Sequence, residues 1–171
     1  AFCISVKHGQ YVTNKFKQAG YTAELITGSM KSDDRKTLID NFKNGKVQIL
    51  VSIDVVSEGF DVEGCYVAIL LRPTQSEALY IQQVGRVLRP EPNKVAIVLD
   101  HVGNTKRHGF VDDVREFDLH QKAKTKRKGE LAPAVETCEQ CFAVYRPQPI
   151  CPVCGHKKEV TKREITMKME S

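Results

Sequence analysis

The fold is decided by the stretch Val51-Ser52-Ile53-Asp54-Val55-Val56-Ser57-Glu58-Gly59-Phe60-Asp61-Val62. Its first residues predict a buried strand, which leaves the sheet into a polar loop that contains a glycine. A second stretch, Gln82-Gln83-Val84-Gly85-Arg86-Val87-Leu88-Arg89-Pro90, predicts a helix end with two arginines three residues apart. If the helix reaches position 89, Arg86 and Arg89 share a face, where two forked guanidiniums suit a polyphosphate or a carboxylate cluster. A solvated basic face fits the same spacing.

Apolar runs and amphipathic segments alternate over residues 1–100. The predicted strands are residues 1–5, 23–26, 47–52, 66–71 and 94–99. Helices are predicted between them, the first ending at Gly20, the second capped by Ser32 and the third capped by Thr74. This order is typical of a mostly parallel sheet with helices on both faces, so the expected fold class is α/β.

Polar residues follow two of the predicted strands. Asp54, Gly59 and Asp61 come after the third strand, and Asp100 and His101 come after the fifth. In a parallel sheet the carboxyl ends of the strands meet at one edge, where ligands bind. The sequence therefore predicts that these polar loops lie together at the carboxyl edge of the sheet.

The pattern weakens after residue 100. Composition predicts a loop over residues 101–109, and residues 111–119 fit either a short helix or an extended segment. A lysine- and arginine-rich run over residues 122–128 ends in Gly129 and predicts a linker. We expect three parts: an α/β domain at 1–120, a basic linker at 121–130 and a small cysteine unit at 131–171.

The charge is divided unevenly between these parts. Residues 1–120 contain 15 basic and 15 acidic side chains, whereas residues 121–171 contain 11 basic and 6 acidic ones and carry the whole net charge of +5. A neutral body with a basic tail indicates an anionic partner for the tail, although a solvated linker has the same composition.

Membrane insertion and export are not indicated by the sequence. It has no apolar run long enough to cross a bilayer and no signal-peptide pattern, so we expect a cytoplasmic protein without a membrane partner. Its opening residues, Phe2-Cys3-Ile4-Ser5, already have the character of a core strand. We interpret the chain as a fragment of a larger protein.

Four of the six cysteines form a metal-binding pattern. Cys138-x2-Cys141 and Cys151-x2-Cys154 are separated by nine residues, and four thiolates at this spacing form a closed tetrahedral site for structural Zn²⁺. About thirty residues bury too little apolar surface to fold alone, so a metal suits the unit. Two disulfides or a redox pair are the alternatives, which an intracellular setting disfavours. His156 is a possible substitute ligand.

Together these motifs resemble the second RecA-like domain of superfamily 2 helicases and translocases over residues 1–100. Phe2-Cys3-Ile4-Ser5 resembles motif IV, and Thr27-Gly28-Ser29-Met30 followed by Arg35 resembles the segment after it. Residues 50–62 resemble motif V. The positions that match motif VI are Gln82, Gly85, Arg86 and Arg89.

The resemblance implies that ATP with Mg²⁺ binds between two RecA-like domains. The chain has no G-x-x-x-x-G-K-[ST] phosphate loop, so a missing N-terminal RecA-like domain would supply it and the chain alone would not hydrolyse ATP. Arg86 and Arg89 would be catalytic arginine fingers, exposed in this chain and supported by Gln82. The residues expected near the nucleotide and the domain interface are Gly59, Asp61 and Gly85. The residues expected on the nucleic-acid backbone are Thr27, Gly28, Ser52 and Asp54.

The motif details resemble the DNA-directed branches of the superfamily. Ile53 stands where DEAD-box RNA helicases usually have Thr, and Gln82 stands where they have His. The segment 100–109 and the cysteine unit resemble RadD-like repair helicases and their phage relatives. DNA, as a single strand or a fork, is therefore the expected partner, and the cysteine unit would add DNA affinity or dock a protein. His101 and His108 would stabilise a loop, or approach the nucleotide or the DNA.

Two functions are compatible with these expectations. The first is the C-terminal half of an ATP-dependent DNA helicase or translocase that takes part in DNA repair. The alternative is a non-catalytic module that binds nucleic acid or protein and holds a structural zinc ion. A phosphate loop upstream of residue 1 would distinguish the first from the second.

Overall fold

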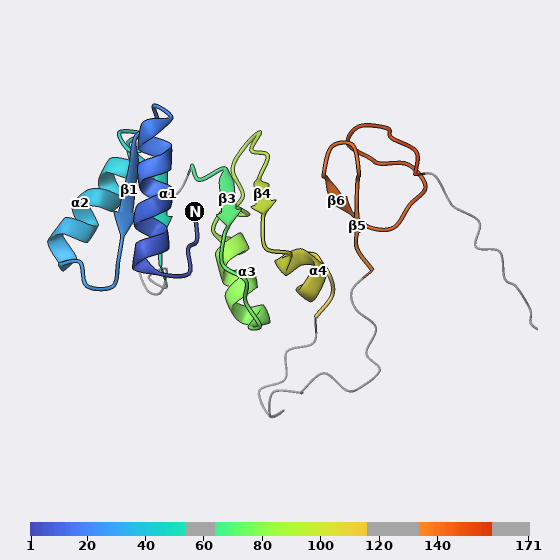
Figure 1. The fold of residues 1–171 in the computed structure, drawn as a ribbon, viewed down its shortest axis with the longest axis horizontal. Coiled ribbons are helices and arrows are strands. Elements are labelled where there is room, and N and C mark those ends of the chain that lie inside the picture. The colour runs from blue at the N-terminus through green and yellow to red at the C-terminus, as the bar shows by residue number, and fades with distance from the viewer. Residues whose placement is uncertain (54–63, 116–133, 159–171) are drawn as a thin grey trace, which may run out of the picture. The chain divides into compact units, whose positions relative to one another are not determined.

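The computed structural model describes residues 1–53, 64–115 and 134–158 (Figure 1). The chain divides into two compact units, Ala1–Thr125 and Lys126–Ser171, which we treat separately. The predicted site residues Asp54, Gly59 and Asp61 lie outside the described residues, as does the basic run 122–128. Across the described ranges, no helix is long and apolar enough to cross a membrane.

A parallel sheet forms the centre of the first unit. Its strands are β1 (Ala23–Ile26), β2 (Ile49–Ser52), β3 (Val67–Leu70) and β4 (Ile97–Asp100). β1 pairs with β2 and β3 pairs with β4, both in parallel. Phe2 bridges Ser52 on one side and Leu70 on the other, and so joins the two pairs into one sheet.

The predicted first strand is shorter than expected. The N–H of Phe2 donates to the carbonyl oxygen of Ile69 at 2.8 Å, and that of Cys3 donates to Ser52 at 2.9 Å. Ser5 is the N-terminal cap of the first helix, and its hydroxyl accepts a hydrogen bond from the N–H of His8 at 3.3 Å. The strand predicted over residues 1–5 is therefore confined to the first three residues, because the helix begins directly after the cap.

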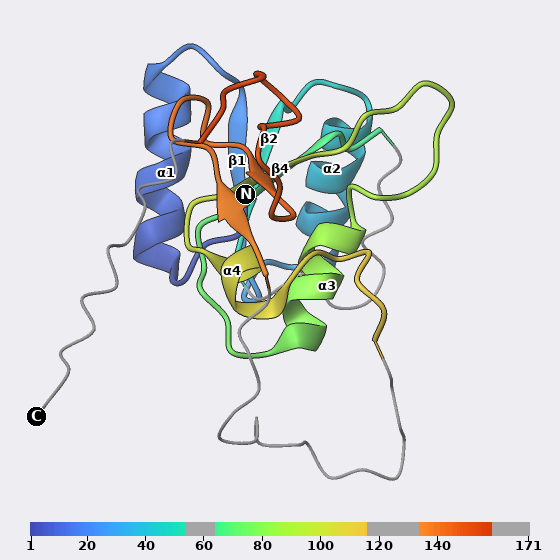
Figure 2. The same ribbon diagram turned by 90° about the vertical axis from the view of Figure 1, so that its right-hand side faces the viewer.

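Helices cover both faces of the sheet, as the sequence predicted (Figure 2). They are α1 (Val6–Gln18), α2 (Ser32–Lys43), α3 (Glu77–Gly85) and a short α4 (Asn104–His108). Phe2 packs in one apolar cluster with the buried side of α3, whereas Cys3 packs in a second cluster with α1. Because successive side chains of a strand point to opposite faces, the two clusters lie on opposite faces of the sheet.

α1 lies unusually close to the sheet at Gly9. A methyl group built at this position would be 2.7 Å from Cδ1 of Leu25 and 3.0 Å from Cδ1 of Ile53. Val12, one turn further on, is buried in the same cluster as Val51. Gly9 therefore allows the helix to approach closely enough for its apolar stripe to reach the strands.

Several predicted element ends differ from the structure. Ser32 is the first residue of α2, whose cap Lys31 makes no side-chain hydrogen bond, so the predicted Ser32 cap is wrong. Ser76, not Thr74, caps α3 by accepting the N–H of Leu79 at 3.2 Å. β4 begins three residues later than predicted, because residues 91–94 form a turn in which Lys94 N–H donates to Glu91.

The loop predicted over residues 101–109 contains α4, so that prediction is wrong. The carboxylate of Asp100 accepts three backbone N–H groups at the start of this helix, from Val102, Asn104 and Thr105. Residues 111–115, the described part of the segment predicted as helical or extended, contain no helix.

The second unit is built around the cysteine pairs. β5 (Glu136–Thr137) and β6 (Val144–Tyr145) form a short antiparallel ladder. The buried cluster of this unit comprises Cys138, Tyr145 and Cys151. Two of its three buried members are thus thiols from different Cys-x2-Cys pairs.

Candidate functional site

The stretch 82–90 leaves the helix after Gly85. α3 ends at Gly85, and Arg86 follows as its C-terminal cap with φ −64° and ψ −33°. A helix that continued to position 90 would need an N–H from Pro90 for the carbonyl of Arg86, and proline has none. Proline also disfavours helical geometry in the residue before it, Arg89. The helix does not reach position 89, so the condition under which Arg86 and Arg89 would share a helix face is not met.

The two arginines lie beside different hollows. Arg86 lines one of about 250 Å³ together with Phe42 and Ser52, whereas Arg89 lines one of about 450 Å³ together with Pro90 and Lys94. Both arginines are half-buried, so the expectation that they are exposed is wrong. Between them Val87 is 1% exposed and packs in the α3 cluster, whereas Leu88 is exposed.

The two neighbouring glutamines at the end of α3 have opposite environments. Gln82 is exposed, whereas Gln83 is buried and its Oε1 has no hydrogen-bond partner within the part of the chain that the structure describes. Gly85 is the last helical residue. Of the two glutamines, only Gln82 is therefore accessible to a ligand from solution.

The turn after β1 is held by one arginine. Nη2 of Arg35 donates to the carbonyl oxygen of Gly28 at 3.2 Å and makes longer contacts of 3.4 Å and 3.5 Å with those of Thr27 and Met30. Gly28 is exposed and Thr27 is half-buried. Arg35, a helical residue of α2, thus fixes the shape of this turn at the carboxyl edge of the sheet.

Ser52, the third described residue predicted to contact nucleic acid, belongs to the sheet itself. It is 5% exposed, and its backbone N–H and carbonyl oxygen pair with Ala1 and Cys3. Its hydroxyl lies 3.4 Å from the carbonyl oxygen of Ala1. Thr27 and Gly28 therefore offer more of the surface at this edge than Ser52 does.

A polar network that the sequence did not predict links the loops after β3 and β4. Asn104 is fully buried; its Oδ1 accepts the N–H of Thr74 at 3.0 Å, and its Nδ2 donates to the carbonyl oxygen of Arg72 at 2.9 Å. The N–H of Asn104 in turn donates to Asp100 at 3.1 Å. One side chain thus satisfies the backbone of the segment that leads into α3.

His108 belongs to this network. Its ring stacks on Tyr80 with the centroids 5.4 Å apart, and Nε2 lies 2.8 Å from the carbonyl oxygen of Thr74. The hydroxyl of Tyr80 donates to the carbonyl oxygen of Gly109 at 3.1 Å, and burial raises the pKa of this phenol. His108 therefore makes a loop-stabilising contact, whereas His101 is exposed.

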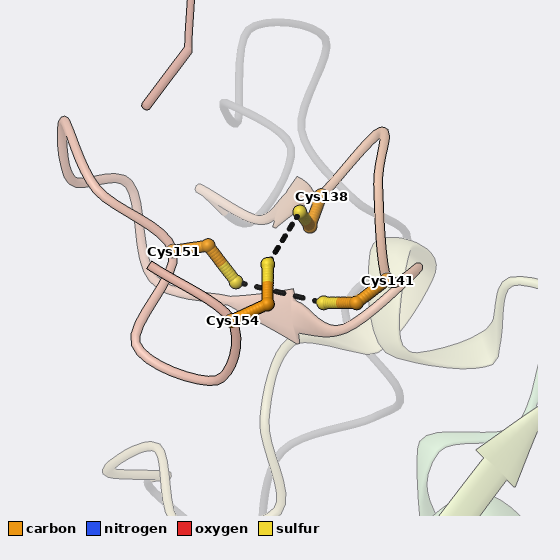
Figure 3. A group of neighbouring side chains, drawn as sticks. All are labelled: Cys138, Cys141, Cys151 and Cys154. Carbon is orange, nitrogen blue, oxygen red and sulfur yellow. Dashed lines mark hydrogen bonds between the residues drawn. The ribbon is translucent and has the colours of Figure 1, made fainter. Parts of the chain in front are cut away.

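The four cysteine sulfurs of the second unit converge on one point (Figure 3). Sγ of Cys138 lies 3.6 Å from that of Cys154, Sγ of Cys141 lies 3.7 Å from that of Cys151, and all four lie within 4.8 Å of one another. A tetrahedral zinc ion with Zn–S bonds of about 2.3 Å spaces its sulfurs about 3.8 Å apart. The four thiols are free rather than paired in disulfides. Their number, element and spacing therefore fit a four-coordinate zinc ion.

The two Cys-x2-Cys pairs repeat the same backbone geometry. Phe142 N–H donates to the carbonyl oxygen of Cys138, and Gly155 N–H donates to that of Cys151, both at 3.0 Å. Cys138 N–H donates to Ala143 and Cys151 N–H donates to His156, both at 2.9 Å. His156 thus occupies a backbone position in the second turn that matches Ala143 in the first.

Backbone amides influence the acidity of the four thiols. Hydrogen bonds from the amides of Cys141 and Gln140 lower the pKa of the Cys138 thiol. Burial raises the pKa of Cys151, but amides of Cys154 and Val153 outweigh it and bring the pKa to about 7. For Cys154 an amide of His156 lowers the pKa, but burial and the neighbouring thiols raise it to about 12. The pKa is thus lowered for the first cysteine of each pair, Cys138 and Cys151.

Comparisons with known proteins give consistent matches. Residues 1–91 match the helicase conserved C-terminal domain. A 51.5 kDa protein of a Lactococcus phage is 32% identical over 172 residues, which cover 99% of this chain and 38% of the phage protein. The putative ATP-dependent helicase IRC3 of Saccharomyces cerevisiae is 32% identical over 103 residues, which cover 60% of this chain and 15% of that protein.

A solved structure shows the same fold. The C-terminal domain of the DEAD-box protein Dbp5 is 26% identical with a TM-score of 0.50, and the match covers 60% of this chain and 61% of that one. The chain spans less than two fifths of the length of the two curated relatives named above. The match to the phage protein extends through the four-cysteine region, which lies beyond residue 91.

Proposed function

Because the chain belongs to the helicase conserved C-terminal domain family, we propose that it forms the C-terminal RecA-like half of an ATP-dependent nucleic-acid helicase or translocase. The observation that carries the proposal is the family match over residues 1–91, which ends directly after the stretch 82–90. Relatives named as ATP-dependent helicases support it. The N-terminal RecA-like domain of the same protein would supply the phosphate loop and the Mg²⁺ site.

On the nucleotide side, Arg86 and Arg89 act as arginine fingers. Their guanidiniums reach across the domain interface to the γ-phosphate of ATP, where they stabilise the charge that develops in the transition state. Gln82, exposed on α3, supports them, and the residues at the domain interface are Gly59, Asp61 and Gly85. Each of the two arginines lines a hollow, and this supports the proposal.

On the nucleic-acid side, the carboxyl edge of the sheet contacts the phosphate backbone. The residues involved are Thr27, Gly28, Ser52 and Asp54. Backbone amides and hydroxyls hold phosphates in position without reading sequence, as a motor that moves along a strand requires. The hydrogen bond from Arg35 to Gly28 supports this role for the Thr27–Gly28 turn. A turn that is already held in one conformation loses little conformational entropy when it binds a phosphate. We propose DNA as the substrate on the form of the Gln-x-x-Gly-Arg-x-x-Arg motif.

In the second unit, Cys138, Cys141, Cys151 and Cys154 hold a structural Zn²⁺. Four thiolates fill the coordination shell and leave no position for a reacting water, so the ion stabilises the unit and does not catalyse. The basic residues around this unit add electrostatic affinity for DNA, which should weaken steeply as salt rises.

The arginine fingers are tested in the full-length protein. Arg86→Ala and Arg89→Ala are each expected to lower the kcat for ATP by roughly a thousandfold, with single-stranded DNA affinity within about twofold of wild type. Lys36→Ala, on the exposed side of α2, is the control and should keep wild-type turnover. Wild-type kcat in both arginine variants would overturn the assignment. Parallel assays with DNA and RNA oligonucleotides identify the nucleic acid that stimulates turnover.

The chain alone gives a second test. Its sequence has no G-x-x-x-x-G-K-[ST] phosphate loop, so the purified 171-residue chain should not hydrolyse ATP. Robust turnover by this chain would contradict the division of the site between two domains.

A further inference from the structure

The two cysteine turns differ at one position. The residue after the second cysteine of each pair has a left-handed backbone, with φ 60° at Phe142 and φ 74° at Gly155. Glycine adopts this conformation without strain, whereas a side chain with a Cβ does not. The two turns have the same pattern of backbone hydrogen bonds, so a glycine can form the turn, as Gly155 does in the second one. The first turn nevertheless carries a phenylalanine.

The phenyl ring gains no burial in return for this strain. Phe142 is 75% exposed, and it is not among the residues of the buried cluster around Cys138, Tyr145 and Cys151. Asparagine or aspartate can offset a left-handed backbone by local hydrogen bonds, and phenylalanine cannot. A strained residue whose side chain does not contribute to packing is typical of a binding position.

We propose that the exposed ring of Phe142 is a stacking platform for an unpaired base of single-stranded nucleic acid. The proposal rests on the proposed function, which makes nucleic acid the substrate. An aromatic ring can stack on any base, so the contact suits a protein that binds without regard to sequence. The basic run at 122–128, which precedes the cysteine unit in the sequence, favours a polyanion over an apolar protein pocket as the ligand of this part of the chain, whereas residues 134–158 themselves hold three basic and two acidic side chains.

The first test separates stacking from folding. In the zinc-loaded 171-residue chain, Phe142→Gly should weaken the binding of a 20-nucleotide oligo(dT) by roughly 5- to 150-fold, measured by fluorescence anisotropy. The substitution relieves the left-handed strain, so the cysteine unit should retain its zinc at least as tightly as wild type. Lost DNA binding therefore cannot be attributed to unfolding. Val153→Ser removes another exposed apolar side chain, from the second turn, and should leave the affinity within about twofold.

The second test reports contact directly. The chain has no tryptophan, so Phe142→Trp places a single indole at the proposed platform. Oligo(dT) should quench its fluorescence by stacking, whereas the indole of Val153→Trp should not be quenched.

Three results would overturn the platform: no binding of oligo(dT) by the wild-type chain at low salt, unchanged affinity in Phe142→Gly, or an unquenched indole in Phe142→Trp. Unchanged affinity in Phe142→Gly or an unquenched indole in Phe142→Trp would indicate that the ring binds a protein partner instead of a base. The kcat measurements on Arg86 and Arg89 test the motor separately, so failure of the platform and failure of the proposed function are distinguishable.

Discussion

The α/β unit and the cysteine unit bury interiors of different composition. In the α/β unit, aliphatic and aromatic side chains form one cluster on each face of the sheet, with Leu70 and Val51 fully buried in them. In the cysteine unit the buried cluster is Cys138, Tyr145 and Cys151, so that two of its three members are cysteines. Burial of apolar area can stabilise the first unit, whereas the second buries little of it, so we expect its stability to depend on the metal that its cysteines are proposed to hold.

The largest expected effect tests this dependence on ligands. Cys151→Ser removes one of the four sulfurs, and we expect the chain to lose its zinc and residues 134–158 to lose their structure. Metal binding of this kind contributes an apparent free energy of about 10–16 kcal/mol, far more than the small buried cluster can supply. Metal analysis with amide hydrogen exchange measures both effects, and the α/β unit should keep its protection.

Cys65→Ser is the matched control, because Cys65 is a free cysteine of the α/β unit. This variant should retain its zinc. If residues 134–158 remain protected from exchange in a strong chelator, the cysteine unit does not need a metal for its stability, and the proposed difference between the two units is wrong.

The second prediction applies to the apolar core of the α/β unit. Leu70 is fully buried in the cluster under α3, and Leu70→Ala should lower the free energy of unfolding by about 2–5 kcal/mol through lost contacts and a cavity. Urea denaturation measures the change, and zinc affinity should not alter. Val114→Ala is the control; Val114 is 99% exposed, so its loss should change the free energy by no more than about 0.5 kcal/mol.

A third, smaller effect concerns a polar group inside the apolar unit. Asn104→Ala leaves the N–H of Thr74 and the carbonyl oxygen of Arg72 without their side-chain partner, and should cost about 1–3 kcal/mol of unfolding free energy. Lys106→Ala, on an exposed position of α4, is the control. Equal stability of the two variants in urea would show that water replaces the amide of Asn104 and that the network does not stabilise the unit.

The sequence predicted those parts of the fold that depend on local pattern. The strand predicted at 66–71 is a continuous apolar run, as buried parallel strands are, and β3 lies within it; β1 coincides with the strand predicted at 23–26. The convergence of the four cysteines was also predictable, because each pair is closed by a short turn of its own.

Features that depend on contacts between distant residues were not predictable. α4 begins at Asn104, whose side-chain partners lie some thirty residues earlier at Arg72 and Thr74. The partial burial of Arg86 and Arg89, on either side of the buried Val87, is likewise not revealed by a helical periodicity.

The smallest predicted effect compares the two cysteine turns with each other. Phe142→Gly relieves a left-handed backbone that costs about 1–2 kcal/mol, but glycine also gains about 0.4–1 kcal/mol of entropy in the unfolded chain. The difference should tighten zinc binding by roughly 2- to 5-fold. Gly155→Ala makes the opposite change, at a position where a new methyl group meets no atom within 4 Å, so strain alone decides the outcome.

Gly155→Ala should therefore weaken zinc binding by a similar factor, measured by competition with a chromogenic chelator. Opposite shifts in zinc affinity would show that both turns favour glycine at this position. Phe142 would then not stabilise its turn, and its exposed ring would need another role, such as binding. Shifts in the same direction would show that the ring stabilises the first turn, and the reason to propose a binding role for Phe142 would disappear.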